Sequence, residues 1–211
     1  MGFFPSLEVA WMPRWQNIDN PRQEKFIRGY SVYPDGGCSE FPWYFDQLEG
    51  FGRDFKRQIK RRYPTPVSFY IQAPTQRSDA NYVDIDPQVK DAYGIPAARL
   101  HFEWDRNALL MWQHGKHSCE QLLRASGAEY QGAAKEPDMP GTSLHETGTL
   151  RMGNDAKRFF TNRFGQSHEV GNLYVCDASV FPNCTDKTTT ISILAFTLRT
   201  SEYLIDNLKK S

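Results

Sequence analysis

Long apolar runs, an excess of either charge and closely paired cysteines are all missing from this sequence of 211 residues. No apolar stretch approaches the roughly 20 residues that a membrane-spanning helix needs, so no membrane span is predicted. Lysine plus arginine number 25 and aspartate plus glutamate also number 25. A chain with zero net charge does not favour nucleic acid or an anionic membrane surface as a partner. The start of the chain also lacks the charged segment that opens a signal peptide.

The four cysteines are scattered along the chain without a Cys-x-x-Cys pair. This spacing argues against a zinc site and against a dense disulfide framework, although a single disulfide stays possible. Cys176 lies in a short apolar run and is interpreted as a small core residue. His114 and His117 stand three positions apart on a predicted helix and could share a metal, but no third ligand lies nearby, so a solvated surface is the preferred interpretation and no metal is predicted.

Three segments in the middle of the chain show the alternation typical of strands, namely residues 67–72, 82–86 and 98–104. No long helical pattern separates them, which favours an antiparallel sheet with one solvated face. A helix is then predicted from a cap at Asp105 or Asn107 to about Ser126. Its predicted inner face consists of Leu109, Trp112, Cys119, Leu122 and Leu123.

The first 60 residues are rich in turns and aromatic side chains, with a clear turn signal at Pro34-Asp-Gly-Gly37. Such aromatics either stack on a sugar or anchor a loop-rich segment to the core, and the second interpretation is preferred. The basic run Lys56-Arg-Gln-Ile-Lys-Arg-Arg62 is interpreted as a solvated helix end. The aromatic residues are Trp11, Trp15, Tyr30, Tyr33, Trp43, Tyr44 and Phe45.

Near the C-terminus, the run Leu173–Cys176 predicts a buried strand. A turn at Pro182-Asn183 follows, and then a helix that begins near Asp186 or Thr188, either of which could cap it. One face of this helix is apolar and is expected to be buried. That face carries Ile191, Leu194, Ala195, Leu198, Ile205 and Leu208.

Two blocks here, Leu144-His-Glu-Thr-Gly-Thr-Leu-Arg-Met-Gly153 and Asn172-Leu-Tyr-Val-Cys-Asp-Ala-Ser-Val-Phe-Pro182, are followed by a Thr-rich helix start at Asp186-Lys-Thr-Thr-Thr-Ile191. Together they resemble the C-terminal signature of the glucose–methanol–choline family of flavin oxidoreductases. Three blocks in the right order are far more specific than a single short motif. Within the family the chain looks most like the pyranose-oxidase and glucoside-3-dehydrogenase branch.

The resemblance implies an α+β fold, with an antiparallel substrate-domain sheet covered by helices and a C-terminal strand–turn–helix that belongs to the flavin-binding domain. Residues 1–140 would form the substrate-binding domain, and residues 141–211 would contact the flavin. The implied cofactor is FAD, and the implied substrate is an alcohol or a sugar whose CH–OH group loses a hydride to flavin N5.

The resemblance also assigns site residues. His145 would be the catalytic base, since neutral imidazole is available near neutral pH. A second catalytic side chain falls on Thr188, where the family has Asn or His; a hydroxyl can orient a substrate but cannot act as a base. Asp177 and Ala178 would pass close to the flavin, although Asp177 also suits a local turn. Thr189 and Thr190 would direct helix N–H groups at the flavin N1/O2 edge.

The sequence contains no Gly-x-Gly-x-x-Gly after a predicted strand, and this is the motif with which the family holds the ADP pyrophosphate. The FAD-binding half is therefore expected to be absent from these residues. The preferred interpretation is the substrate-binding and C-terminal, flavin-contacting portion of an FAD-dependent oxidoreductase, and two alternatives to it stay open. One is a degenerate, non-catalytic relative that acts as a binding module, which the departure at Thr188 and the missing glycine motif both favour. The other is a subunit that works only with a partner chain that binds FAD.

Overall fold

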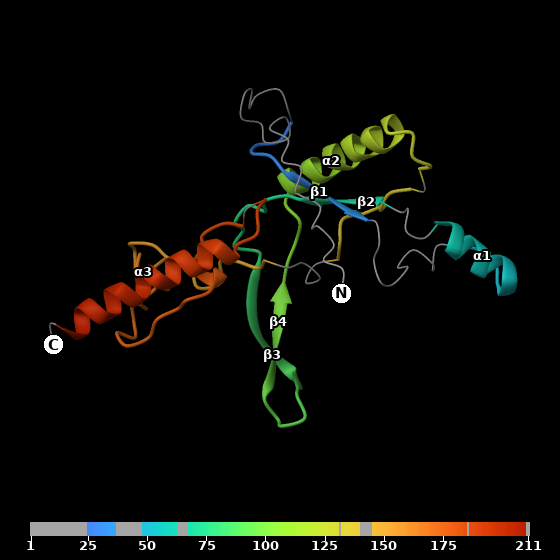
Figure 1. The fold of residues 1–211 in the computed structure, drawn as a ribbon. Helices are drawn as coiled ribbons and strands as arrows, with labels where there is room; N and C mark the ends of the chain where they lie inside the picture. Colours follow the sequence, from blue (N-terminus) through green and yellow to red (C-terminus); the bar gives the residue numbers. More distant parts are fainter. Residues whose placement is uncertain are drawn as a thin grey trace.

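The computed structural model describes residues 25–36, 48–62, 67–130, 132–139, 145–184 and 186–209. Within these ranges the chain has an α+β fold that agrees with the predicted class (Figure 1). Trp11, Trp15, Trp43, Tyr44 and Phe45 lie outside the described residues. The elements are β1 (Ser31–Gly36), α1 (Gly52–Arg62), β2 (Val67–Gln72), β3 (Tyr82–Lys90), β4 (Pro96–His101), α2 (Arg106–Ala125), the 3-10 helix η3 (Ala178–Val180) and α3 (Thr190–Leu208).

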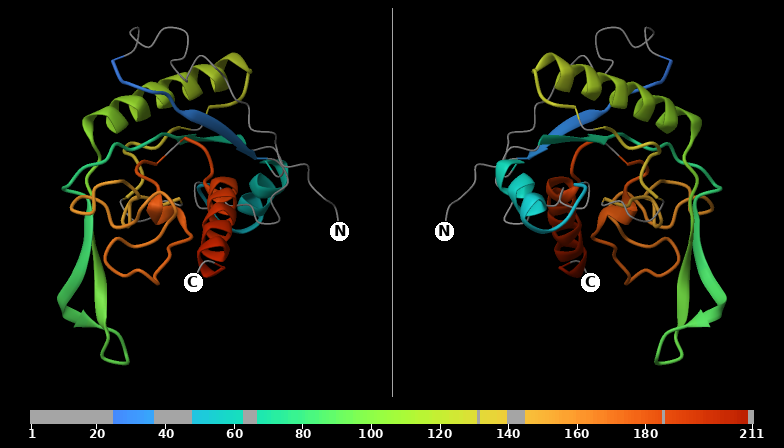
Figure 2. Two further views of the ribbon diagram at one scale, coloured as in Figure 1. Left: turned by 90° about the vertical axis from the view of Figure 1, so that its left-hand side faces the viewer. Right: turned by 90° about the vertical axis from the view of Figure 1, so that its right-hand side faces the viewer.

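The strands β1 and β2 pair antiparallel and carry α2 on one face. Figure 2 shows α2 on one side of this pair and α3 on the other. The register places Val32 opposite Ile71, and both belong to the core under α2. Helix and strand approach closely at Gly115, where an added Cβ would lie 2.9 Å from Cδ1 of Ile71. The absence of a side chain there lets α2 lie directly on the sheet.

Helix α2 begins and ends as the sequence predicts. The Asp105 carboxylate accepts a hydrogen bond from the Ala108 N–H at 2.9 Å, which satisfies one of the free donors of the first turn. Ser126 caps the other end, and Gly127 follows with a φ of +76°. The predicted inner face is only partly correct, since Leu109, Trp112 and Leu123 line a cavity instead. The residues buried on α2 are Ala108, Met111, Gly115 and Cys119.

The prediction of one sheet containing all three central strands is wrong. Within the described residues, β2 pairs with β1, while β3 and β4 form a separate hairpin that extends away from α2. Residues 73–81 connect the β1–β2 pair to the β3–β4 hairpin and do not belong to either sheet. Alternation found all three strands, although β4 begins and ends before the predicted bounds of 98–104, and alternation does not say which strand is the neighbour. The strand β3 also continues through Pro87, beyond the predicted end, because a register shift between Ile85 and Lys90 accommodates the proline.

The turn predicted at Pro34-Asp-Gly-Gly37 is also corrected. Pro34 to Gly36 belong to β1, with Pro34 opposite Phe69, and Gly37 lies outside the described residues. A proline can occupy an edge strand, since its missing N–H costs no ladder bond on the open side. The basic run at 56–62 does end a helix, and α1 buries none of its described residues, so the prediction of a solvated helix is confirmed.

The strand predicted at Leu173–Cys176 does not form. Tyr174 makes a single bridge to Gln166, and Val175 donates its N–H to the Gly165 carbonyl at 2.8 Å. Val175 is buried, but Cys176 is exposed, so its assignment to the core is wrong. A strand needs a continuous neighbour for its alternate N–H groups, and the irregular segment around 165–167 supplies only isolated bonds.

Helix α3 starts later than predicted, and its expected side-chain cap is absent. Thr189 is the N-cap residue and makes no capping side-chain bond, while Asp186 instead accepts a hydrogen bond from Ser31. The helix buries Phe196 and Thr200. Its predicted apolar face is exposed, with Ile191 at 79% and Leu198 at 62%. Among the described residues, no helix combines the length and the hydropathy that crossing a membrane requires.

Candidate functional site

His145 lies where two cavities meet. The first cavity, of about 950 Å³, is bounded by β2, α2 and the segment 128–138. The second, of about 450 Å³, is bounded by η3 and the start of α3. Among the described residues, His145 is the one side chain that lines both. A group at this junction can contact a molecule in either cavity.

The segment after His145 is held in place by backbone bonds to η3. The Leu150 N–H donates to the Ser179 carbonyl at 3.1 Å, and the Met152 N–H donates to the Val180 carbonyl at 2.8 Å. Beneath them, Val175, Val180 and Phe196 form a buried cluster. The two sequence blocks of the signature are therefore side by side because they share one core.

His145 has an unusual backbone conformation, with a φ of +75°. Residues other than glycine rarely adopt this left-handed backbone conformation, and such backbone strain is typical of functional sites. Its carbonyl oxygen accepts a hydrogen bond from Cys184 Sγ at 3.8 Å. On the ring, Nδ1 lies 3.5 Å from the side-chain nitrogen of Gln72, at the end of β2. His145 is half-buried, with Gln72 against its ring and Cys184 bonded to its backbone carbonyl.

The second cavity brings together most of the site residues that the sequence predicts. Asp177, Ala178, Thr189 and Thr190 all line it with His145. Asp177 also accepts a hydrogen bond from the Ser179 N–H at 2.8 Å, as expected for a turn-forming aspartate. Thr189 is buried and begins α3, so the positive end of that helix faces the cavity.

Thr188 is placed differently from its neighbours. It is exposed and is not among the residues that line either cavity. Its role beside His145 therefore remains a prediction. The neighbouring Lys187 bonds to Asp186 and to the Ser31 hydroxyl.

The sequence did not identify two polar residues of the site. Gln72 lies beside His145, and nothing in its sequence context marks it beyond its position at the end of a strand. Ser179 lines the second cavity, and its buried hydroxyl has no hydrogen-bond partner among the described residues. Buried hydroxyls nearly always have a partner, so this oxygen is an exception among the described residues. The sequence feature that could have identified Ser179 is its position in the Asp-Ala-Ser part of the second signature block.

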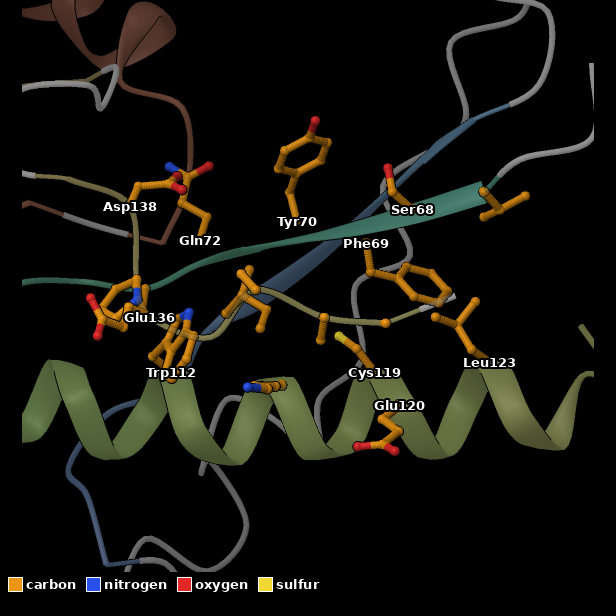
Figure 3. A pocket seen from close by; sticks show the side chains of 18 of the residues that line it. Ser68, Phe69, Tyr70, Gln72, Trp112, Cys119, Glu120, Leu123, Glu136 and Asp138 are labelled. Atoms are coloured by element: carbon orange, nitrogen blue, oxygen red, sulfur yellow. The ribbon is translucent and has the colours of Figure 1, made fainter. Parts of the chain in front are cut away.

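The first cavity combines aromatic, apolar and acidic side chains (Figure 3). Trp112 and Cys119 reach into it from α2, and Glu136 and Asp138 from the opposite segment. Burial raises the pKa of the Cys119 thiol to about 11, so this sulfur stays protonated. Wide, partly apolar cavities with a few polar groups are typical of small-molecule sites.

Arg151 of the signature block is a partly buried cation beside the site. Its Nε has no hydrogen-bond partner among the described residues. Burial lowers the pKa of the guanidinium, and the nearby positive charge of Arg77 lowers it further. Its side chain lies under Gly148, whose added Cβ would be 3.8 Å from Cγ of Arg151.

Comparison with known proteins agrees with the sequence signature. A family model described as GMC oxidoreductase matches residues 76–197. The gluconate 2-dehydrogenase flavoprotein of Pantoea cypripedii is 32% identical over 141 residues, which cover 63% of this chain and 22% of the relative. The 2-methyl-1,2-propanediol dehydrogenase of Mycolicibacterium austroafricanum is 33% identical over 157 residues, 73% of this chain and 28% of the relative. The pyranose 2-oxidase of Tricholoma matsutake is 25% identical over 81% of this chain and 31% of the relative. The chain thus spans less than a third of the length of each of these relatives.

Proposed function

Because this chain belongs to the GMC oxidoreductase family, we propose that it supplies the substrate-binding and flavin-contacting part of an FAD-dependent enzyme that oxidises the CH–OH group of an alcohol or a sugar. The observation that carries this proposal is the position of His145 between the two cavities. One cavity would hold the substrate and the other the reactive edge of the cofactor. The relatives are named for their action on gluconate, a diol and a pyranose, and this supports the substrate class.

In this proposal His145 is the general base. It takes the proton of the substrate hydroxyl as the hydride leaves the adjacent carbon, and neither transfer is favourable alone. FAD, when bound, supplies the acceptor for that hydride. Because the protein would hold the base and the hydride acceptor at fixed positions around the substrate, the reaction would not depend on a collision between separate molecules. This lowers the entropic part of the barrier.

The residues of the second cavity fit the ring edge of a flavin. Asp177, Ala178, Thr189 and Thr190 surround a space into which the N-terminus of α3 opens. The partial positive charge of that helix end stabilises the negative charge that a reduced flavin carries at its N1/O2 edge.

The first cavity fits a substrate of sugar size. Its volume of about 950 Å³ lies in the upper part of the range for small-molecule sites. Trp104 and Trp112 line it and offer flat faces to sugar rings, and the Lys116 ammonium lies 5.0 Å above the Trp112 ring. Glu136 and Asp138 supply acceptors for hydroxyl groups.

We further propose that the active unit requires a flavin-binding partner or domain that covers the exposed side of α3. Ile191, Leu194 and Leu198 are all more than 60% exposed and follow one another along one face of the helix. An apolar face of this extent is typical of a surface that is covered in the working assembly. The same covering surface would also pack against the segment 173–176.

The alternative function is a non-catalytic binding module. The observation that favours it is Thr188, which is exposed and replaces the second catalytic side chain of the family. In that case the first cavity would still bind a sugar, but no proton would be transferred.

Reconstitution distinguishes these functions. The 211-residue chain would be purified alone and together with a flavin-binding GMC partner chain, and each sample would be desalted and its flavin absorbance measured. We expect a colourless chain alone, because the residues lack the glycine-rich pyrophosphate motif. The assembled pair should retain FAD and reduce an artificial dye when a sugar or alcohol is added. Sugar binding by the pair without dye reduction would favour the binding module. Stoichiometric FAD on the chain alone would contradict the expectation that the FAD-binding half is absent from these residues.

A further inference from the structure

We propose that Gln72 is a positioning residue for His145, whose side-chain amide decides which nitrogen of the imidazole carries the proton. This inference rests on the proposed function, in which His145 is the base. It concerns a contact between the β1–β2 pair and the signature block, 73 positions apart in sequence.

The sheet directs Gln72 toward His145. In an antiparallel pair, residues directly opposite each other project from the same face. Val32 and Ile71 form one such pair and face α2. The next pair, Ser31 and Gln72, therefore faces the other way, toward the signature segments. Figure 3 shows Gln72 on the side of β2 away from α2.

Both members of this second pair contact a segment of the site. The Ser31 hydroxyl donates to the Asp186 carboxylate at 2.8 Å, just before α3. The Gln72 amide nitrogen lies 3.5 Å from Nδ1 of His145. The end of the sheet thus holds the two segments that bound the second cavity. Because a ladder of backbone bonds fixes the pair, Gln72 is placed by the sheet and not by a loop.

The chemistry of the imidazole gives this contact its importance. A neutral imidazole has one N–H, so a free lone pair on Nε2 requires the proton to stay on Nδ1. The Nδ1–H group then needs an acceptor. In the structure the amide nitrogen of Gln72 is the atom nearest Nδ1, so the proposal includes a half-turn of the terminal amide that exchanges its nitrogen and oxygen and lets the carbonyl oxygen accept from Nδ1–H. The opposite orientation, in which the amide NH₂ donates to Nδ1, would leave the proton on Nε2 and block the base.

The same orientation also suits the product of proton transfer. Once Nε2 has taken the substrate proton, both ring nitrogens are donors. The Gln72 oxygen continues to accept from Nδ1, so no rearrangement accompanies the step. An acceptor at this position therefore serves both protonation states that the proposed reaction uses.

The tautomer can be measured on the 211-residue chain without flavin. Nitrogen-15 labelling of its five histidines and two-bond proton–nitrogen NMR distinguish Nδ1–H from Nε2–H, and His145→Ala identifies the signals by their loss. We expect His145 to be mainly Nδ1–H in the wild type. Gln72→Met should shift it to Nε2–H, the form that unconstrained histidine favours. Gln72→Glu, which restores an acceptor of the same length, should keep Nδ1–H.

The matched control is Gln113→Met, the same change on an exposed position of α2, which should leave the His145 signals unchanged. A wild-type chain in which His145 is mainly Nε2–H would overturn the proposal. This measurement does not depend on whether any variant folds. An unchanged tautomer in a folded Gln72→Met chain would overturn it as well.

The assembled enzyme provides an independent test. Gln72→Met should lower kcat about 10-fold, as expected for a group that orients a functional histidine, while KM changes less than about 2-fold. Gln72→Glu should restore much of the kcat. An unchanged kcat in Gln72→Met would overturn the positioning role. An assembly that shows the tautomer shift but has no dehydrogenase activity would overturn the proposed function and leave the role of Gln72 standing.

Discussion

Ser31 and Asp186 are joined by a 2.8 Å hydrogen bond across 155 positions of sequence. Ser31 is buried in β1, and Asp186 lies just before α3. The Tyr33 hydroxyl, from the same face of β1, donates to the Asp186 backbone carbonyl at 3.1 Å. The β1–β2 pair and the segment that leads into α3 are therefore connected by polar contacts, and their relative position depends on them.

Replacing Ser31 by alanine should destabilise the chain. The substitution removes a buried donor to a carboxylate, and a hydrogen bond to a charged group contributes about 1.5–3 kcal/mol. We expect the free energy of unfolding, measured by urea denaturation, to fall by about 1–2 kcal/mol, since Lys187 still contacts Asp186. Ser201→Ala, at an exposed position of α3, is the control and should change it by less than about 0.5 kcal/mol. Equal effects of the two substitutions would argue against a structural role for the Ser31–Asp186 bond.

Replacing Gly115 by alanine should also be unfavourable, although alanine is the better helix former by about 1 kcal/mol. The added Cβ would lie 3.1 Å from Cγ2 of Ile71 and 3.2 Å from Cε2 of Tyr30. Tyr30 cannot move freely, because its hydroxyl is bonded to His114 Nδ1 at 2.7 Å. Overpacking of this kind costs about 1–3 kcal/mol. A lower melting temperature for Gly115→Ala, with Gly171→Ala unchanged in its open surroundings, would confirm the close approach.

The β3–β4 hairpin should weaken in acid. Hydrogen bonding from Arg99 lowers the pKa of Asp84 to about 2, and a weaker bond from His101 acts in the same direction. Because the folded-state pKa lies below the ordinary value of about 4, the stabilisation is present above pH 4 and is lost as the pH falls toward 2. The amide protection factors across the hairpin, which are corrected for the intrinsic pH dependence of exchange, should therefore fall over this interval. In Asp84→Asn this effect should become smaller and leave only the part due to Asp86, whose pKa is also lowered, by backbone hydrogen bonds from Val89 and Gln88; an unchanged effect would argue against Asp84 as its source.

In the assembled enzyme, His145 and Thr188 should differ in importance. We expect His145→Ala to lower the turnover number about 100-fold or more, as typical for loss of a general base. Thr188→Ala should have a smaller effect, since a hydroxyl can only orient the substrate and Thr188 lies outside both cavities. Dye-reduction rates at saturating substrate measure both. Equal losses would argue against His145 as the sole base.

Much of the local structure could be predicted from the sequence, because it depends on neighbouring residues. Alternation identified the positions of β2, β3 and β4, Asp105 and Gly127 marked the ends of α2, and the signature blocks identified the family. The boundary proposed at residue 140 has no such local marker, and it stays a prediction.

The tertiary structure decided which faces are covered and which distant residues meet. Periodicity shows that α3 has an apolar face, but not whether anything packs on it, and in this structure Ile191 and Leu198 are exposed. Alternation likewise shows a strand without its neighbour, so the separation of β3–β4 from β1–β2 was not foreseeable. The sequence alone determined that His145 belongs to a family signature. Its contact with Gln72 arises because the β1–β2 register directs that amide toward the signature block, a relation that no local pattern of residues encodes.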